Sequence, residues 1–161
     1  MEQAALIKKL QSGFWFRLFL FKSLPAAFFS GIRLDSVSEE NSVVSIRYSW
    51  FSQNPFRSIY FACLGMAAEM SSGILSLIHT QHQKPGVSML VLNMKANFHK
   101  KAVGKIRFEC NDGVLIKNTI EDAIKTQTGQ TCVTHSKGFD EAGNCIAEFY
   151  ITWTFKQKSI K

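Results

Sequence analysis

Apolar side chains run almost without interruption along residues 58–83, the longest uncharged and helix-compatible stretch of the chain. Glu69 is the one carboxylate inside it. A helix that is apolar on nearly every face is expected to be buried all round. The pattern therefore predicts a long central helix in the core.

The segments around this helix alternate between apolar and polar positions, as half-buried strands do. Residues 32–37 and 44–50 predict two paired strands with a turn at 39–41, and turns at 100–101 and 140–143 separate further strands. Residues 113–126 are ambiguous by pattern, but Asp112 can cap a helix and isoleucines recur at helical spacing, which favours a short helix. The remaining predicted elements are helices over 3–12 and 14–29 and strands over 87–98, 104–110, 130–139 and 144–155.

This order predicts an α+β fold, with an antiparallel sheet of about six strands wrapped around one long central helix. A chain of 161 residues is expected to form a single domain with a substantial core. We expect residues 1–30 to form an N-terminal helical appendage, residues 31–156 the core, and residues 157–161 a loose basic tail.

The segment 14–29 is rich in aromatic residues and superficially resembles a short signal peptide. Arg17 and Lys22 interrupt its apolar run, Pro25 would break a spanning helix, and the run is shorter than the ~20 residues that a membrane span needs. We expect one or two amphipathic helices that pack onto the domain. Contact with a membrane surface through residues 14–29 is the less favoured alternative.

The net charge of +7 favours an anionic partner but does not identify one. The chain has no zinc-finger spacing and no RNP-like aromatic motif, so nucleic acid is not expected. Cys63, Cys110, Cys132 and Cys145 show no CxxC spacing and are expected to be free thiols in a reducing, cytoplasmic location. His79 and His82 are three residues apart, but no third ligand accompanies them, and no metal is expected.

Glu69 is the strongest candidate for chemistry, because carboxylates are rarely buried unless they are paired. Residues three and four positions away share its helix face, and Gly65, Ser72 and Gly73 make that face small enough for a ligand to approach. The alternative is a structural glutamate that accepts hydrogen bonds from serine or backbone groups.

Three stretches carry a resemblance to a known family: Asn54-Pro-Phe-Arg-Ser-Ile-Tyr60-Phe-Ala, the helix leading to Glu69, and Phe98-His-Lys-Lys-Ala102. They resemble the hotdog-fold thioesterase superfamily, and more closely the DUF4442 and PaaI-like acyl-CoA thioesterase group, over nearly the whole chain. PaaI-like members carry a loop Asn, then a His, and an acidic residue nine positions after that His. Asn54 and Glu69 match this pattern, whereas Tyr60 stands in place of the His and Phe61 in place of a small residue.

The resemblance implies hydrolysis of an acyl thioester of coenzyme A or acyl carrier protein, with no cofactor beyond the coenzyme A of the substrate. Glu69, reaching in from a partner subunit, would act as general base or nucleophile, and backbone N–H groups of Phe61 or Ala62 would bind the oxyanion. The implied oligomer is a homodimer or a tetramer. The remaining implied roles are positioning of water or carboxylate by Asn54, hydrogen bonding or packing by Tyr60, support of Glu69 by Ser72 and Gly65, and coenzyme A phosphate binding by Arg57, Lys100, Lys101 and Lys105.

Two other functions remain as alternatives. A non-catalytic hotdog protein that binds acyl-CoA or lipid is favoured by the loss of the His at position 60. A dehydratase or hydratase is less consistent with the sequence, because it would need a His beside the acid.

Overall fold

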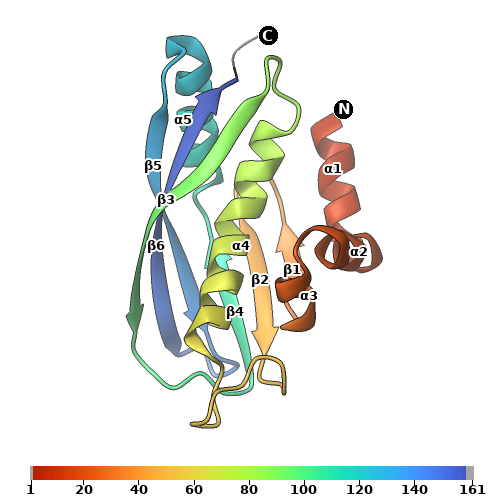
Figure 1. Ribbon diagram of the computed structural model, residues 1–161, viewed down its shortest axis with the longest axis vertical. Coiled ribbons are helices and arrows are strands. Elements are labelled where there is room, and N and C mark those ends of the chain that lie inside the picture. Colours follow the sequence, from red (N-terminus) through yellow and green to blue (C-terminus); the bar gives the residue numbers. More distant parts are fainter. Residues whose placement is uncertain (1, 159–161) are drawn as a thin grey trace.

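The computed structural model describes residues 2–158. A six-stranded antiparallel sheet with the order β1-β2-β4-β5-β6-β3 curves around helix α4 (Figure 1). This is the hotdog arrangement that the resemblance implies. The elements are α1 (Glu2–Gln11), α2 (Gly13–Ser23), α3 (Pro25–Phe29), β1 (Arg33–Val37), β2 (Ser42–Arg47), α4 (Phe61–Thr80), β3 (Val87–Phe98), β4 (Lys105–Cys110), α5 (Gly113–Thr126), β5 (Gln130–Phe139) and β6 (Cys145–Gln157).

The core forms between α4 and the inner face of the sheet. Alternate residues of β4 and β6 point inward, and Ile106, Phe108 and Phe155 are fully buried. On the helix, Ala67 and Leu75 are also fully buried, so the small and branched side chains of α4 allow it to lie close to the strands. The alternation read from the sequence therefore identifies the inner face correctly.

Helix α4 is long and apolar enough to cross a membrane, but most of it lies inside the protein as the core helix. The sequence predicted that this helix is buried on all sides, but the structure leaves one face uncovered. Phe61 is exposed, and Gly65, Met66 and Glu69 are only partly buried on the same face. That uncovered face carries the candidate site.

The segment 14–29, expected to form one or two helices, forms two, because Pro25 starts α3 at its first turn, where the missing N–H has no cost. One strand boundary differs from the prediction. The strand expected to continue to residue 50 ends at Arg47. There the Ser52 hydroxyl donates to the Arg47 carbonyl and accepts the Ser49 N–H, which turns the chain and leaves Trp50 exposed.

The short helix predicted over 113–126 is confirmed as α5, which packs against β5, β6 and α4. Of the predicted basic tail, Gln157 belongs to β6 and Lys158 donates its N–H to the Gly86 carbonyl. Residues 159–161 lie outside the described part of the chain.

Candidate active site

Glu69 lies in an apolar cavity of about 500 Å³ between the exposed face of α4 and the inner face of β3 and β6. Among the described residues that line it, Glu69 is the only charged one, and the others are apolar. The residues of α4 contribute one wall, and the two strands contribute the other. The lining residues are Phe61, Ala62, Gly65, Met66, Glu69, Met94, Ala96, Phe98 and Phe149.

Burial raises the pKa of the Glu69 carboxyl above its ordinary value, because the apolar surroundings disfavour the ionised form. Desolvation is the whole cause: no hydrogen bond or neighbouring charge from residues 2–158 contributes to the shift. The alternative of a structural glutamate held by serine hydroxyls is therefore not what the geometry favours. A carboxylate that is desolvated and has no partner can accept a proton from a bound molecule.

Ser72, expected to support Glu69, bonds to its backbone and not to its carboxylate. The Ser72 hydroxyl donates to the Glu69 carbonyl oxygen at 3.2 Å and accepts the indole N–H of Trp153 at 3.0 Å. The carboxylate itself lies over Gly73, where a Cβ atom would stand 3.1 Å from Glu69 Oε1. Gly73 therefore lies directly beside the carboxylate, as its spacing from Glu69 along the helix predicted, and the Trp153 ring lies beside Gly73. Sequence reasoning gave Trp153 no role.

The N-terminus of α4 offers backbone donors at the other end of the cavity. Tyr60 caps the helix in an extended conformation, and its carbonyl accepts the N–H groups of Cys63 and Leu64. Among residues 2–158, no acceptor takes up the N–H groups of Phe61 and Ala62. These are the two positions named for oxyanion binding, and the first N–H groups of a helix carry its partial positive charge.

Tyr60 does not line the cavity. Its side chain is 44% exposed and packs edge-on against the Phe61 ring. Rings then follow one another from Phe61 to Phe98 and from Phe98 to Phe149, at centroid distances of 6.4 and 5.7 Å. The mouth of the cavity is therefore aromatic.

Asn54 shapes the loop that precedes α4. Its Oδ1 atom accepts the N–H groups of Phe56 and Ser58 and the Ser58 hydroxyl, all within 3.2 Å. Asn54 is not among the residues that line the cavity. Its observed contacts hold the loop, which in turn sets where the helix begins.

The four basic residues named for coenzyme A phosphates lie in different settings. Arg57 and Lys101 are exposed on loops that the Ile59 N–H to Ala102 carbonyl bond holds together at the N-terminal end of α4. Lys100 pairs with Asp140 at 3.3 Å, and Lys105 pairs with Asp35 at 2.7 Å in a separate hollow beside β1 and β2. Arg57 and Lys101 are thus the two without a carboxylate partner among the described residues.

The histidines of α4 and of the segment after it have other partners. His79 contacts the Glu39 carbonyl and Gln3, and His82 contacts Glu2. A different group, His99, Cys145 and Glu148, brings ligand atoms within 4.8 Å of one another. Glu148 and Phe149 point to opposite faces of β6, so this group lies on the other side of the sheet from Glu69. All four cysteines are free thiols.

The cavity walls contributed by the strands were not assigned from the sequence. Met94, Ala96 and Phe149 come from β3 and β6, far from Glu69 along the chain. The alternation of the last strand placed Phe149 on the inner face. It could not place Phe149 opposite Glu69, because that depends on how the sheet wraps α4.

Comparison with known proteins supports this architecture. The chain resembles a protein of unknown function from Pseudomonas aeruginosa described as a probable thioesterase, with a TM-score of 0.75 at 21% identity over 89% of this chain and 95% of the other. It also resembles a putative thioesterase from Shewanella oneidensis, with a TM-score of 0.74 at 10% identity over 94% and 97% of the two chains. A thioesterase from Haemophilus influenzae aligns with a TM-score of 0.62 at 14% identity over 87% and 88%.

These similarities establish the hotdog fold. No match was found among curated protein sequences. The model of the family described as "Domain of unknown function (DUF4442)" matches residues 17–155, which is most of the chain. The protein therefore belongs to the DUF4442 family.

Proposed function

We propose that this protein hydrolyses acyl thioesters of coenzyme A or of acyl carrier protein. The observation that carries the proposal is the Glu69 carboxylate, desolvated and without a partner among residues 2–158, in an apolar cavity whose lining includes Phe61 and Ala62 at a helix N-terminus. The descriptions of the similar structures as thioesterases support the same reaction.

In the general-base route, Glu69 takes a proton from water as its oxygen attacks the thioester carbonyl. The N–H groups of Phe61 and Ala62 bind the resulting oxyanion. The C–S bond then breaks, and the thiolate recovers the proton from Glu69. In the nucleophilic route, the carboxylate attacks the carbonyl, the C–S bond breaks and the thiolate leaves. Water then hydrolyses the mixed anhydride to the free acid and the Glu69 carboxyl, which gives its proton to the thiolate. A single turnover in ¹⁸O-labelled water tests the second route, because only that route can place ¹⁸O in Glu69, by attack of water on the Glu69 carbonyl of the anhydride.

The geometry of α4 favours a site shared between two copies. Glu69 lies eight positions after Phe61, which is about 12 Å along the helix axis. A water molecule and a thioester carbonyl that are hydrogen-bonded in a row between a carboxylate and N–H donors span a shorter distance than this. We therefore infer that Glu69 of one copy faces the N–H groups of the other.

Strand β3 supplies a surface for that assembly. It is one of the two edge strands of the sheet, and an uncovered edge of this length is normally paired or protected. Its exposed side chains include Leu90, Leu92, Met94 and Phe98, between 42% and 62% exposed. Antiparallel pairing of β3 with its copy would cover the open side of the cavity and make a homodimer, from which a tetramer could be built.

The substrate chemistry follows from the cavity. Its apolar walls suit an acyl chain or an aryl group, and its end at the α4 N-terminus adjoins the exposed Arg57 and Lys101. These two cations suit the phosphates of coenzyme A better than Lys100 and Lys105, which already hold carboxylates.

The test is thiol release from short, long and aryl acyl-CoAs by the wild type and by Glu69→Gln. Loss of a positioned acid or base typically costs about 100-fold or more in rate, and we expect that loss in the variant. Ser76→Ala is the matched control, because Ser76 lies in the same helix but its hydroxyl bonds only to the Ser72 carbonyl. Full activity in folded Glu69→Gln would remove Glu69 from the mechanism.

A non-catalytic acyl-CoA-binding protein is the second candidate function. Two observations favour it: Asn54 Oδ1 is bonded to its own loop, and Tyr60 does not line the cavity. This candidate predicts saturable acyl-CoA binding without thiol release, and affinity that survives Glu69→Gln.

A further inference from the structure

Helix α2 is apolar on nearly every face, yet the protein covers only one side of it. Phe16 and Leu20 are buried, while Phe14, Leu18 and Phe21 are 72%, 43% and 55% exposed. A helix of this composition normally has both sides covered. The uncovered side therefore needs a partner outside the described chain.

The exposed apolar surface continues beyond α2 without a break. The Phe21 ring contacts Phe28, Phe28 contacts Phe29, and Phe29 contacts Phe51, with centroids between 5.1 and 5.7 Å apart. Phe51 then contacts Trp50, which is 76% exposed. We call this surface the aromatic face and define it by Phe14, Leu18, Phe21, Phe29, Trp50 and Phe51.

The segments that carry the aromatic face have charges of one sign. No Asp or Glu occurs in residues 3–34 or in residues 41–68 before Glu69. Lys8, Lys9 and Lys22 are exposed on α1 and α2, and Arg57 is exposed on the loop that follows Phe51. Bulky aromatic side chains with lysines and no acids are the composition of an interfacial surface that binds anionic lipid.

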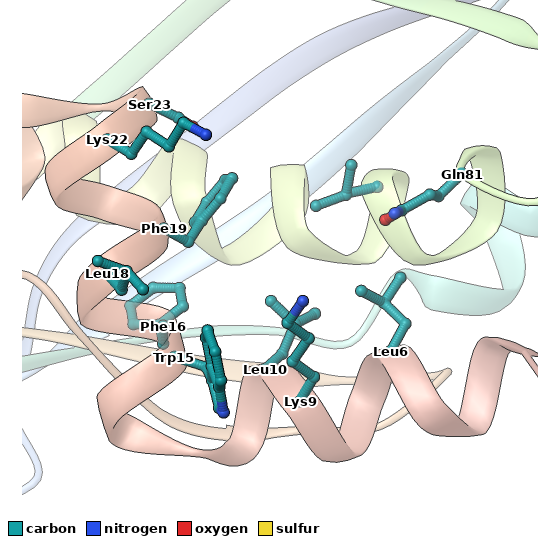
Figure 2. A pocket seen from close by; sticks show the side chains of 11 residues that line it. Leu6, Lys9, Leu10, Trp15, Phe16, Leu18, Phe19, Lys22, Ser23 and Gln81 are labelled. Atoms are coloured by element: carbon teal, nitrogen blue, oxygen red, sulfur yellow. The ribbon is translucent and has the colours of Figure 1, made fainter.

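A hollow of about 450 Å³ opens beside this face, between α1, α2 and α4 (Figure 2). Leu6, Leu10, Phe16 and Phe19 give it apolar walls, and the amino groups of Lys9 and Lys22 stand at its border. Lys9 Nζ lies 5.2 Å from the centroid of the Trp15 ring. An apolar recess bordered by ammonium groups matches a molecule with an acyl chain and an anionic head.

We propose that the aromatic face docks on the surface of a membrane that contains anionic phospholipid. A second copy of the chain fits this surface less well, because a two-fold interface would bring the lysines of both copies together. The face lies on the β1 side of the sheet, opposite β3 (Figure 1). It would stay uncovered if β3 pairs with its copy, and the proposal does not depend on thioester hydrolysis.

The test is co-sedimentation of the full chain with vesicles of phosphatidylcholine alone or with phosphatidylglycerol added. We expect binding to the mixed vesicles that falls as salt rises, because each lysine near an anionic surface adds a screened attraction. Phe14→Ser combined with Trp50→Ser should weaken binding at least about tenfold, since both rings lose their insertion. Lys22→Glu should weaken binding about tenfold to the mixed vesicles only.

The matched controls change similar residues elsewhere. Val133→Ser removes a side chain that is 53% exposed on β5, and Lys117→Glu reverses an exposed charge on α5. Both should bind vesicles as the wild type does. Brominated phospholipid should quench Trp15 and Trp50, and Trp15→Phe with Trp50→Phe should abolish the quenching, because Trp153 is buried.

Equal vesicle binding by the wild type and by Phe14→Ser with Trp50→Ser would overturn the proposal. A wild-type chain that does not bind anionic vesicles would overturn it as well. If Phe14→Ser with Trp50→Ser changes the molecular mass in light scattering but not vesicle binding, the face is an interface between copies and the proposal is wrong.

Discussion

Gly73→Ala should raise stability and lower activity in the same molecule. Position 73 lies in the interior of α4, where alanine is more favourable than glycine by about 1 kcal/mol. For a domain of this size, that gain raises Tm by about 2–4 °C. The new methyl group, however, would stand 3.1 Å from Glu69 Oε1 and 3.6 Å from Glu69 Cδ.

The carboxylate must give way, because the other side of the methyl group is fixed. The Trp153 ring lies 3.6 Å from the added carbon, and its indole N–H is bonded to Ser72. We therefore expect the Glu69 carboxylate to shift by a few tenths of an ångström. Since a misplacement of about 1 Å can cost about 100-fold in rate, the expected loss in kcat is about three- to tenfold.

The assay pairs a thermal melt with steady-state thiol release from acyl-CoA. Gly65→Ala is the stability control, because its methyl group meets Phe149 and Met94 only at 3.7 and 3.9 Å and should raise Tm without touching the carboxylate. In a Glu69→Gln background, Gly73→Ala should cause no further loss of rate. A stabilised Gly73→Ala with unchanged kcat would refute the reasoning that the position of this carboxylate sets the rate.

Two further predictions concern stability and pH. Because burial raises the pKa of Glu69, the folded state binds the carboxyl proton more tightly than the unfolded state does. The ionised carboxylate therefore destabilises the fold at a pH above its folded-state pKa. At a pH below its unfolded-state pKa, the carboxyl is protonated in both states and this cost disappears. Glu69→Gln should therefore raise Tm at pH 8, and this gain in Tm should shrink as the pH falls towards 4. The kcat of the wild type should rise as the pH passes the raised pKa of Glu69. A Tm gain in the variant that does not depend on pH would contradict this reasoning. Gly138→Ala should destabilise the fold by about 1–3 kcal/mol in urea unfolding, because its Cβ would lie 2.6 Å from the fully buried Phe108 ring. A variant as stable as the wild type would show instead that β5 can move away from this ring.

Much of the fold follows from local patterns. The alternation in 130–139 and 144–155 reflects the period of a half-buried strand, and the apolar run over 58–83 reflects a helix packed on several sides. Details of the boundaries depend on single residues. The Ser52 hydroxyl ends β2 at Arg47, three residues before the predicted end, and Pro25 decides that the segment 14–29 forms two helices.

The candidate site also has parts that the sequence predicts and parts that it does not. Glu69 could be singled out from the sequence, because a lone carboxylate in an apolar helix is rare unless it has a function. Its position in an apolar cavity agrees with that reasoning. The roles given to Asn54, Tyr60 and the basic residues came from resemblance, and they stay predictions. Their observed contacts show loop shaping by Asn54 and carboxylate pairing by Lys100 and Lys105.

The helix, the strands and the candidate carboxylate can be read from the sequence, because each depends on the spacing of residues close together in the chain. That Phe149 and Met94 face Glu69, that Trp153 lies beside Gly73, and that α2 keeps one apolar side uncovered are features of the tertiary structure alone. These facts depend on how the sheet curves around α4 and on which helix face meets which strand. Contacts between residues distant in sequence are set by the packing of the whole chain.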